Sequence, residues 1–189
     1  MSAYDLPSTV CVGGREYKIR SGWRHILKIL EACSDPDISQ RAKTIILLRI
    51  FYPEWKDIPR EHISEACERA SAFIDCGQKK SNTVKPRLID WEQDAAIIIP
   101  AVNSVAKQEV RTDPDIHWWT FHGWFMEIEG GVFASVLRIR SKIAKHQKLD
   151  KSEDEFYREN RSVIDLKNSD SAEARAAKED IRQWLEGGG

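Results

Sequence analysis

The sequence lacks a long hydrophobic run and lacks an excess of charge of either sign. A membrane-spanning helix needs about 20 apolar residues, and the longest apolar stretch, residues 44–52, is shorter and is interrupted by Arg49. The 29 Lys and Arg nearly balance 30 Asp and Glu, so the net charge of −1 provides no general field to attract nucleic acid or an anionic membrane. The N-terminus also lacks the basic and apolar regions of a signal peptide. We therefore expect a non-secreted protein whose partners are neither membranes nor nucleic acids.

Paired cysteines and catalytic motifs are missing as well. Cys11, Cys33, Cys67 and Cys76 are widely spaced and form no C-x-x-C pair, which disfavours a zinc site and predicts small buried apolar residues. The chain contains no P-loop, nucleophile elbow, H-E-x-x-H motif or dinucleotide-binding glycine motif. The closest pair of histidines on one predicted helix does not have the i, i+4 spacing that zinc favours. The sequence thus predicts a protein that is not an enzyme and needs no cofactor or metal.

What is present is enough apolar material for a folded core, because 41% of the residues are apolar and seven are Trp. Near the N-terminus, residues 9–20 predict a short β-hairpin, since apolar and polar residues alternate on both sides of a Gly-Gly dipeptide that suits a two-residue turn. The apolar positions are Val10, Val12, Tyr17 and Ile19, and the turn is Gly13-Gly14. An isolated hairpin is only marginally stable in water, so we expect it to pack against helices or to pair with another chain.

Most of the remaining sequence has helical periodicity, with apolar residues recurring every three or four positions. Polar caps, prolines and glycines predict where the helices begin and end. The predicted starts are Ser21, Ser39, Pro59, Asp90 and Asp113-Pro114-Asp115, and the predicted ends are Asp35-Pro36-Asp37, Pro53, Gly77 and Gly130-Gly131. One more helix is expected after these glycines, with Phe133, Val136, Leu137, Ile139 and Ile143 on its inner side. Asp90 and Gln93 have the spacing of a capping box, and Pro100 should kink or split the helix that they open. Residues 78–87 are polar and predict a loop.

The character of the chain changes after about Lys145, where apolar positions become sparse among charged and small residues. Such a stretch cannot bury much surface by itself. We therefore predict a mainly α protein in two parts. Residues 1–145 form a helical body with the N-terminal hairpin, and residues 146–189 form a charged, partly helical or flexible C-terminal extension.

The aromatic-rich stretch 115–128 is the most informative segment. On a helical projection its large apolar side chains occupy an arc of roughly 220°, whereas a helix on one core needs a stripe of little more than about 100°. Such an arc fits a central helix surrounded by others, or a helix that also faces a partner, since Trp and Met are enriched in interface cores. The candidate interface residues are Trp118, Trp119, Phe121, Trp124 and Met126, with Val10, Val12 and Tyr17 of the hairpin as a second contact.

Several segments occur in an order that resembles the bacteriophage Gp15 family, over about residues 5–165. The tryptophan motif Asp115-Ile116-His117-Trp118-Trp119-Thr120-Phe121 is the most specific of them. The others are Val12-Gly13-Gly14-Arg15-Glu16-Tyr17-Lys18-Ile19, Phe73-Ile74-Asp75-Cys76-Gly77, Leu88-Ile89-Asp90-Trp91-Glu92-Gln93-Asp94-Ala95, Ile139-Arg140-Ser141-Lys142-Ile143 and Phe156-Tyr157-Arg158.

The resemblance implies a role in building phage tails. Proteins of this family belong to tailed phages and prophages and are typically encoded between the major tail protein and the tape measure protein, a position similar to that of tail assembly chaperones. The resemblance therefore implies a chaperone that binds the tape measure protein in the host bacterial cytoplasm. Self-association is expected, and the tail tube protein is a further candidate partner.

Two alternatives remain open at this point. The first is a structural tail or connector component that is retained in the virion, because it would draw on the same fold and the same exposed aromatic residues. The second is a nucleic-acid-binding module. Its basic residues would be Lys79, Lys80, Lys85 and Arg87, or Lys142, Lys145 and Lys148.

Overall fold

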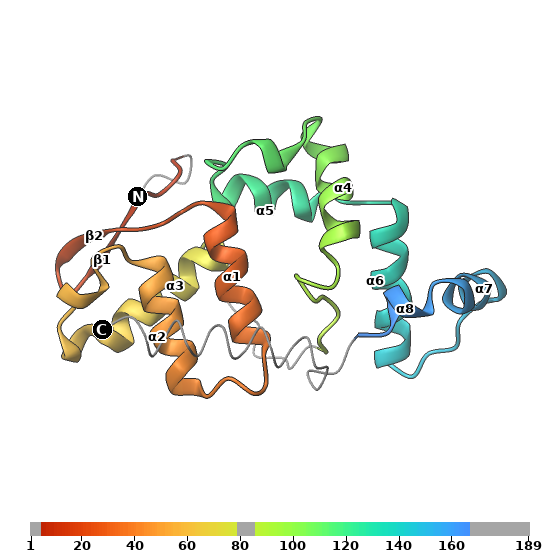
Figure 1. The fold of residues 1–189 in the computed structure, drawn as a ribbon, viewed down its shortest axis with the longest axis horizontal. Helices are drawn as coiled ribbons and strands as arrows, with labels where there is room; N and C mark the ends of the chain where they lie inside the picture. The colour runs from red at the N-terminus through yellow and green to blue at the C-terminus, as the bar shows by residue number, and fades with distance from the viewer. Residues whose placement is uncertain (1–4, 79–85, 167–189) are drawn as a thin grey trace.

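The computed structural model describes residues 5–78 and 86–166 and has the predicted mainly α fold (Figure 1). In this part of the chain, eight α-helices follow one antiparallel hairpin. The hairpin, α1, α2 and α3 lie at one end of the molecule, α6, α7 and α8 lie at the other end, and α4 and α5 lie between them. None of the described helices is both long and apolar enough to cross a membrane.

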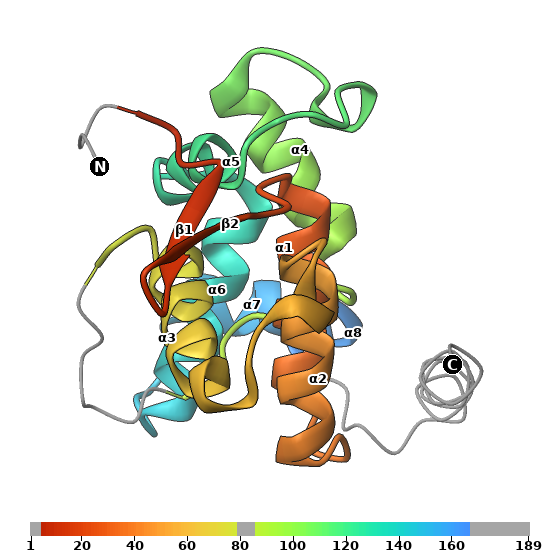
Figure 2. The same ribbon diagram turned by 90° about the vertical axis from the view of Figure 1, so that its left-hand side faces the viewer.

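The predicted hairpin is confirmed as β1 (Thr9–Val12) and β2 (Arg15–Lys18), with Val10 opposite Tyr17. Gly13 and Gly14 form the turn with φ of 56° and 78°, a region that glycine enters without steric cost. The four alternating apolar residues of residues 9–20 are buried. The hairpin lies against α3 (Figure 2), and the Gly13 amide donates to Glu65 at the start of that helix.

The next three helices are α1 (Trp23–Ser34), α2 (Gln40–Phe51) and α3 (Ile63–Ile74), close to the predicted spans. Ser39 caps α2 as predicted, because its hydroxyl accepts from the amide of Ala42. The predicted Ser21 cap is wrong: α1 has Gly22 at its N-cap, and the Ser21 carbonyl instead accepts from Trp118. Short 3-10 helices at Trp55–Asp57 and Arg60–His62 precede α3.

The central helices are α4 (Ala95–Ala106) and α5 (Trp118–Met126), and both begin later than predicted. The capping box expected at Asp90 forms only in half: the Asp90 carboxylate accepts from the backbone N–H of Gln93 at 2.9 Å, but the Gln93 side chain donates to the carbonyls of Val163 and Asp165. Of the two outcomes expected at Pro100, a kink or a split, the split does not occur, since α4 is one continuous helix. A 3-10 helix at Val110–Thr112 leads toward α5.

The helix expected at residues 113–115 does not begin there. The Asp113 carboxylate accepts from the Asp115 amide in a local turn, so it caps no helix. The following residues are extended, because Ile116 and Trp118 form backbone hydrogen bonds with Trp23 and Ser21. Only after this long-range contact does α5 begin, with His117 at its N-cap.

The last three helices are α6 (Gly131–Ala144), α7 (Lys151–Glu159) and α8 (Arg161–Ile164). Asp150 and Glu153 form a complete capping box at the start of α7. Ile164 of α8 is buried against Val136 and Ile139 of α6 in a small second core. The predicted tail of residues 146–189 thus includes a helical part that packs on α6, and residues 167–189 lie outside the described residues.

The main core joins the hairpin to all of the first six helices. Its aromatic centre includes Trp23, which stacks on Phe121 at 4.6 Å with the rings 8° from parallel.

Three sequence predictions about burial are wrong. Cys11 and Cys33 are exposed on the outer sides of β1 and α1, and Ile143, expected on the inner side of its helix, is 42% exposed.

Candidate protein-interaction surface

Five of the eight predicted interface residues lie in the core and do not reach the surface. Val10, Val12 and Tyr17 form the inner face of the hairpin, and Trp118 and Phe121 are 2% and 0% exposed. Trp118 and Phe121 are buried because α5 is surrounded by α1, α4 and the end of α3. Its wide apolar arc is therefore that of a central helix. The predicted second contact through the hairpin therefore lacks its three named side chains.

The two tryptophans of the motif hold the end of α3. The indole N–H of Trp118 donates to the carbonyl of Ile74 at 2.8 Å, and that of Trp119 donates to the carbonyl of Phe73 at 2.9 Å. The last carbonyls of a helix have no i+4 partner within it, so the Trp118 indole satisfies the Ile74 carbonyl, and the Trp119 indole adds a second donor to the Phe73 carbonyl, which also accepts from the Cys76 amide at 3.0 Å. The tryptophan motif and the Phe73–Gly77 motif are thus contact partners in the fold.

His117 positions the start of α5 and the chain that precedes the hairpin. Its Nδ1 accepts from the amide of Trp119 at 3.1 Å, so this nitrogen carries no proton. The other ring nitrogen, Nε2, then carries the proton and donates to the carbonyl of Pro7 at 3.0 Å. Through this contact, Leu6 is held near the N-terminal end of α5, where it is 54% exposed.

Three of the predicted residues are at least partly exposed on α5. Met126 is 61% exposed, and Trp119 and Trp124 are half-buried. Val132, in the first turn of α6, is 52% exposed and follows Met126 across the short α5–α6 connection. We call the side of α5 that carries Trp119 and Met126, together with Val132, the α5 face; Trp124 lies about 140° or more around the helix from both and is not part of it. Two of the four large exposed apolar side chains of the described residues belong to this face, whereas Leu6 lies near the N-terminal end of α5 and Ile143 lies near the C-terminal end of α6.

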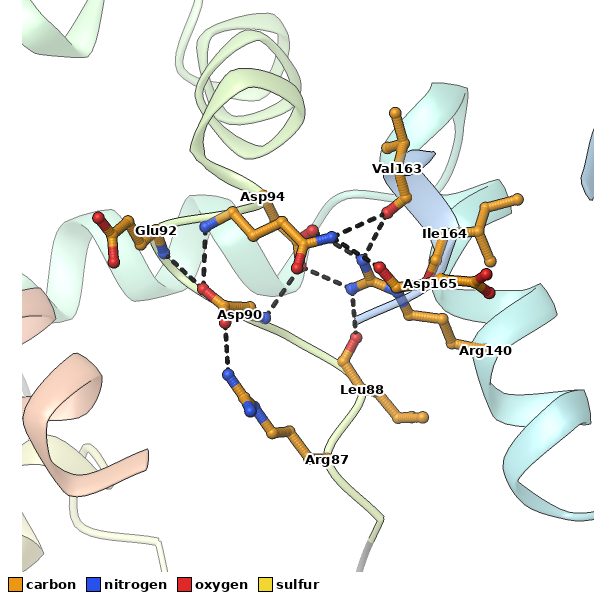
Figure 3. Close-up of polar contacts among 10 residues, drawn as sticks. Arg87, Leu88, Asp90, Glu92, Asp94, Arg140, Val163, Ile164 and Asp165 are labelled. Atoms are coloured by element: carbon orange, nitrogen blue, oxygen red, sulfur yellow. Dashed lines mark hydrogen bonds and ion pairs between the residues drawn. The ribbon is translucent and has the colours of Figure 1, made fainter. Parts of the chain in front are cut away.

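The helix that carries Val132 is joined to the start of α4 by a buried ion pair (Figure 3). Arg140 of α6 and Asp94, which immediately precedes α4, are 5% and 0% exposed. The Arg140 guanidinium also donates to the carbonyls of Leu88, Val163 and Ile164. One side chain therefore joins α6 to the start of α4 and to α8, and fixes the helix on which Val132 lies.

Among the described residues, burial shifts the pKa of three potentially reactive side chains, His122, Cys67 and Cys76, so that each favours its neutral form. No cluster of three or more His, Cys, Asp or Glu side chains that could hold a metal ion occurs in the described residues. Burial lowers the pKa of His122, whose ring lies 5.4 Å from that of Trp118, and so favours its neutral form. Burial likewise raises the pKa of Cys67, and that of Cys76 to about 11, which keeps both thiols protonated.

The basic residues proposed for nucleic acid are only partly described. Lys79, Lys80 and Lys85 lie outside the described residues. Arg87 is paired with Asp90, and Lys142 is paired with the nearly buried Glu153. These two side chains are therefore already neutralised within the fold.

Sequence reasoning missed Val132, Leu6 and the Arg140–Asp94 pair. Val132 follows two glycines and begins a new helix, so helical periodicity placed it on neither face. A usable signal for the surface was Gly123, a glycine inside an aromatic helix, which is unfavourable for the helix itself.

Comparison with known proteins identifies one match. A family model described as Bacteriophage Gp15 protein matches residues 4–166, which is most of the chain. No curated protein matches the chain. No solved structure matches it either.

Proposed function

Since the chain belongs to the bacteriophage Gp15 family, we propose that it acts as a non-catalytic tail assembly chaperone that binds the tape measure protein in the host bacterial cytoplasm. Family membership supports a structural or assembly role in a phage. The finer assignment depends on the α5 face, which includes the exposed Met126 and Val132 and the half-buried Trp119.

The α5 face has the character that a chaperone surface needs. Contiguous exposed apolar side chains are uncommon on soluble proteins and typically mark an interaction site. The tape measure protein is long and hydrophobic, so its apolar segments need cover until tube subunits replace the chaperone. A small apolar face binds such segments weakly one at a time, and many copies along one client give a strong but displaceable coat.

Co-expression with the tape measure protein of the same phage tests the proposal. We expect the wild-type chain to keep this client soluble and to co-purify with it. The double variant Met126→Glu, Val132→Glu should lose most of this effect, because a partner would then have to desolvate two carboxylates. Its unfolding midpoint in urea should stay close to the wild type, because both side chains are exposed.

A matched control uses the exposed apolar residue at the far end of α6. Ile143→Glu introduces the same charge at a side chain that is 42% exposed but lies away from the α5 face. This variant should retain client binding. If the client stays insoluble with a well-folded wild-type chain, the chaperone proposal is wrong.

A second experiment distinguishes the chaperone from the structural alternative. Mass spectrometry of purified phage particles should find the chain absent or scarce if it is a chaperone. A fixed copy number per particle would instead identify a tail or connector component.

Self-association and contact with the tail tube protein belong to the proposal as well. Light scattering of the free chain measures the first, and light scattering of its mixture with tube protein measures the second.

A further inference from the structure

The α5 face lies in the longest part of the described chain without a basic residue. Residues 113–137 contain no Lys or Arg but contain four acidic residues, Asp113, Asp115, Glu127 and Glu129, whereas the whole chain has 29 Lys and Arg among 189 residues. All four acidic side chains are exposed. The chain therefore carries two exposed acidic residues before α5 and two after it, and we call these pairs the acidic borders of α5.

The acidic border behind α5 does not serve the helix. The C-terminal end of a helix carries partial negative charge and is stabilised by basic residues, yet the last turn of α5 has none and is followed by Glu127 and Glu129. Within the described residues, neither carboxylate forms an ion pair, unlike Glu109, Glu153 and Asp94. The two carboxylates therefore interact unfavourably with the C-terminal end of α5, and they remain available to pair with basic groups of a partner.

Gly123 adds a second, independent observation. It lies inside α5 between Trp119 and Met126 on one side of the helix, and it is exposed. A methyl group at this position would touch nothing within 4 Å, so no contact inside the chain requires a glycine there. A glycine on an exposed helix face lets the backbone of another segment approach closely.

We propose that the α5 face binds an apolar helical segment that carries Lys or Arg at its ends. This inference specifies the partner segment of the chaperone surface and so rests on the proposed function. The acidic borders would pair with the basic ends, and the apolar middle would cross α5 at Gly123. A second copy of the chain is the poorer occupant, because any pairing of two α5 faces brings acidic borders together and offers no Lys or Arg.

Two synthetic peptides test the charge preference directly. Both have the same apolar helical middle, and one has Lys at each end where the other has Glu. Fluorescence anisotropy of labelled peptide with the full chain at low salt should show at least tenfold tighter binding of the Lys-ended peptide. The difference should shrink at about 0.5 M salt, because exposed charges are then screened. Equal affinities at low salt would overturn the inference.

Charge reversal localises the preference. The double variant Glu127→Lys, Glu129→Lys should lose most of the tenfold difference in affinity between the two peptides. It should keep the fold, because basic residues suit a helix C-terminus. Glu155→Lys with Glu159→Lys makes the same change on α7, where both side chains are exposed, and should retain the preference. If both double variants behave alike, the binding is general electrostatic attraction and the α5 face is not the site.

Gly123→Ala separates folding from binding. Alanine is the better helix former, so the ratio of folded to unfolded chain should rise about two- to fivefold. Binding of the Lys-ended peptide should fall at least fivefold, because the added methyl group holds the partner backbone away. Unchanged or tighter binding in this stabilised variant would show that no backbone approaches at Gly123.

The outcomes distinguish this inference from the chaperone proposal. If the wild type prefers the Lys-ended peptide but does not keep the tape measure protein soluble, the chaperone proposal fails and the surface assignment stands. If it keeps the client soluble equally well with and without the Glu127 and Glu129 reversal, the assignment fails and the proposal stands. Sedimentation that finds a dimer dissociated by Met126→Glu would make a second copy the occupant and overturn the inference.

Discussion

The guanidinium group of Arg140 faces the carboxylate of Asp94 in a buried, two-pronged ion pair. Nη1 lies 2.6 Å from Oδ2 and Nη2 lies 2.8 Å from Oδ1. The other N–H groups donate to the carbonyls of Leu88, Val163 and Ile164 at 2.7 to 2.8 Å, so every donor of the guanidinium has a partner. Two charges that would be costly to bury separately are thus fully compensated.

Removing Arg140 should therefore destabilise the chain strongly. Arg140→Met leaves the Asp94 carboxylate and three carbonyls without their donor in the interior, and we expect a loss of about 3–5 kcal/mol in the free energy of unfolding. Arg140→Lys should recover only part of this loss, because an ammonium group cannot form the two-pronged contact. Urea unfolding of the purified variants measures both values.

An exposed ion pair provides the comparison for Arg140. Arg158 and Asp154 of α7 are also paired at 2.6 Å, but their side chains are 76% and 43% exposed. Arg158→Met should change the free energy of unfolding by less than about 1 kcal/mol. A similar small change for Arg140→Met would show that water reaches the Asp94 carboxylate and that the pair is not a buried support.

The elements of the fold were predictable where the signal is local. Gly13-Gly14 between alternating residues specifies the hairpin, and Ser39 before an apolar period specifies the start of α2. Helix starts were misplaced where a distant segment competes for the same groups. Residues 116–118 pair with residues 21–23, and the Gln93 side chain bonds to the chain at residues 163 and 165.

The candidate surface was predictable only in part, for a related reason. Periodicity shows that α5 is apolar around most of its circumference, but it does not show which sides other helices cover. Trp118 and Phe121 are covered by the core, whereas Met126 is not. The Arg140–Asp94 pair was missed because a charged residue in a helix ordinarily indicates a solvated face, and nothing local identifies a partner 46 residues away.

The two neighbouring tryptophans should differ in what their indole N–H contributes. Trp118→Phe removes a hydrogen bond to the Ile74 carbonyl from a side chain that is 2% exposed, and it should cost about 1–3 kcal/mol beyond the lost ring area. Trp119→Phe removes the bond to the Phe73 carbonyl, which keeps its hydrogen bond from the Cys76 amide, and it should cost about 0.5–1.5 kcal/mol. Trp124→Phe is the reference for the ring change alone, and urea unfolding of all three ranks them. Equal losses at Trp118 and Trp124 would refute a role for the indole of Trp118.

The two turn glycines should respond differently to alanine. Both have positive φ, so each Ala pays about 1–2 kcal/mol of backbone strain. At Gly14 a methyl group meets nothing, but at Gly13 it would lie 2.6 Å from the His62 ring. Gly13→Ala should therefore be more destabilising than Gly14→Ala by about 1 kcal/mol. In a His62→Ala background this excess should vanish, and its persistence in thermal or urea unfolding would place the strain elsewhere in the turn.

Acid should release the contact that joins α4 to the 3-10 helix before α5. Glu109 accepts from the side chain and backbone of Arg111 and from Asn103, and the hydrogen bonds from Arg111 lower its pKa from 4.5 to about 2. Because the folded pKa lies below the unfolded value, the contribution of Glu109 to stability is complete above about pH 4.5 and is lost as the pH falls toward 2. The difference in unfolding free energy between the wild type and Glu109→Gln should thus be constant above about pH 5 and narrow below it. In an Arg111→Met background the same comparison should be much flatter across pH 2–6, and an unchanged slope would mean that Arg111 does not set the titration of Glu109.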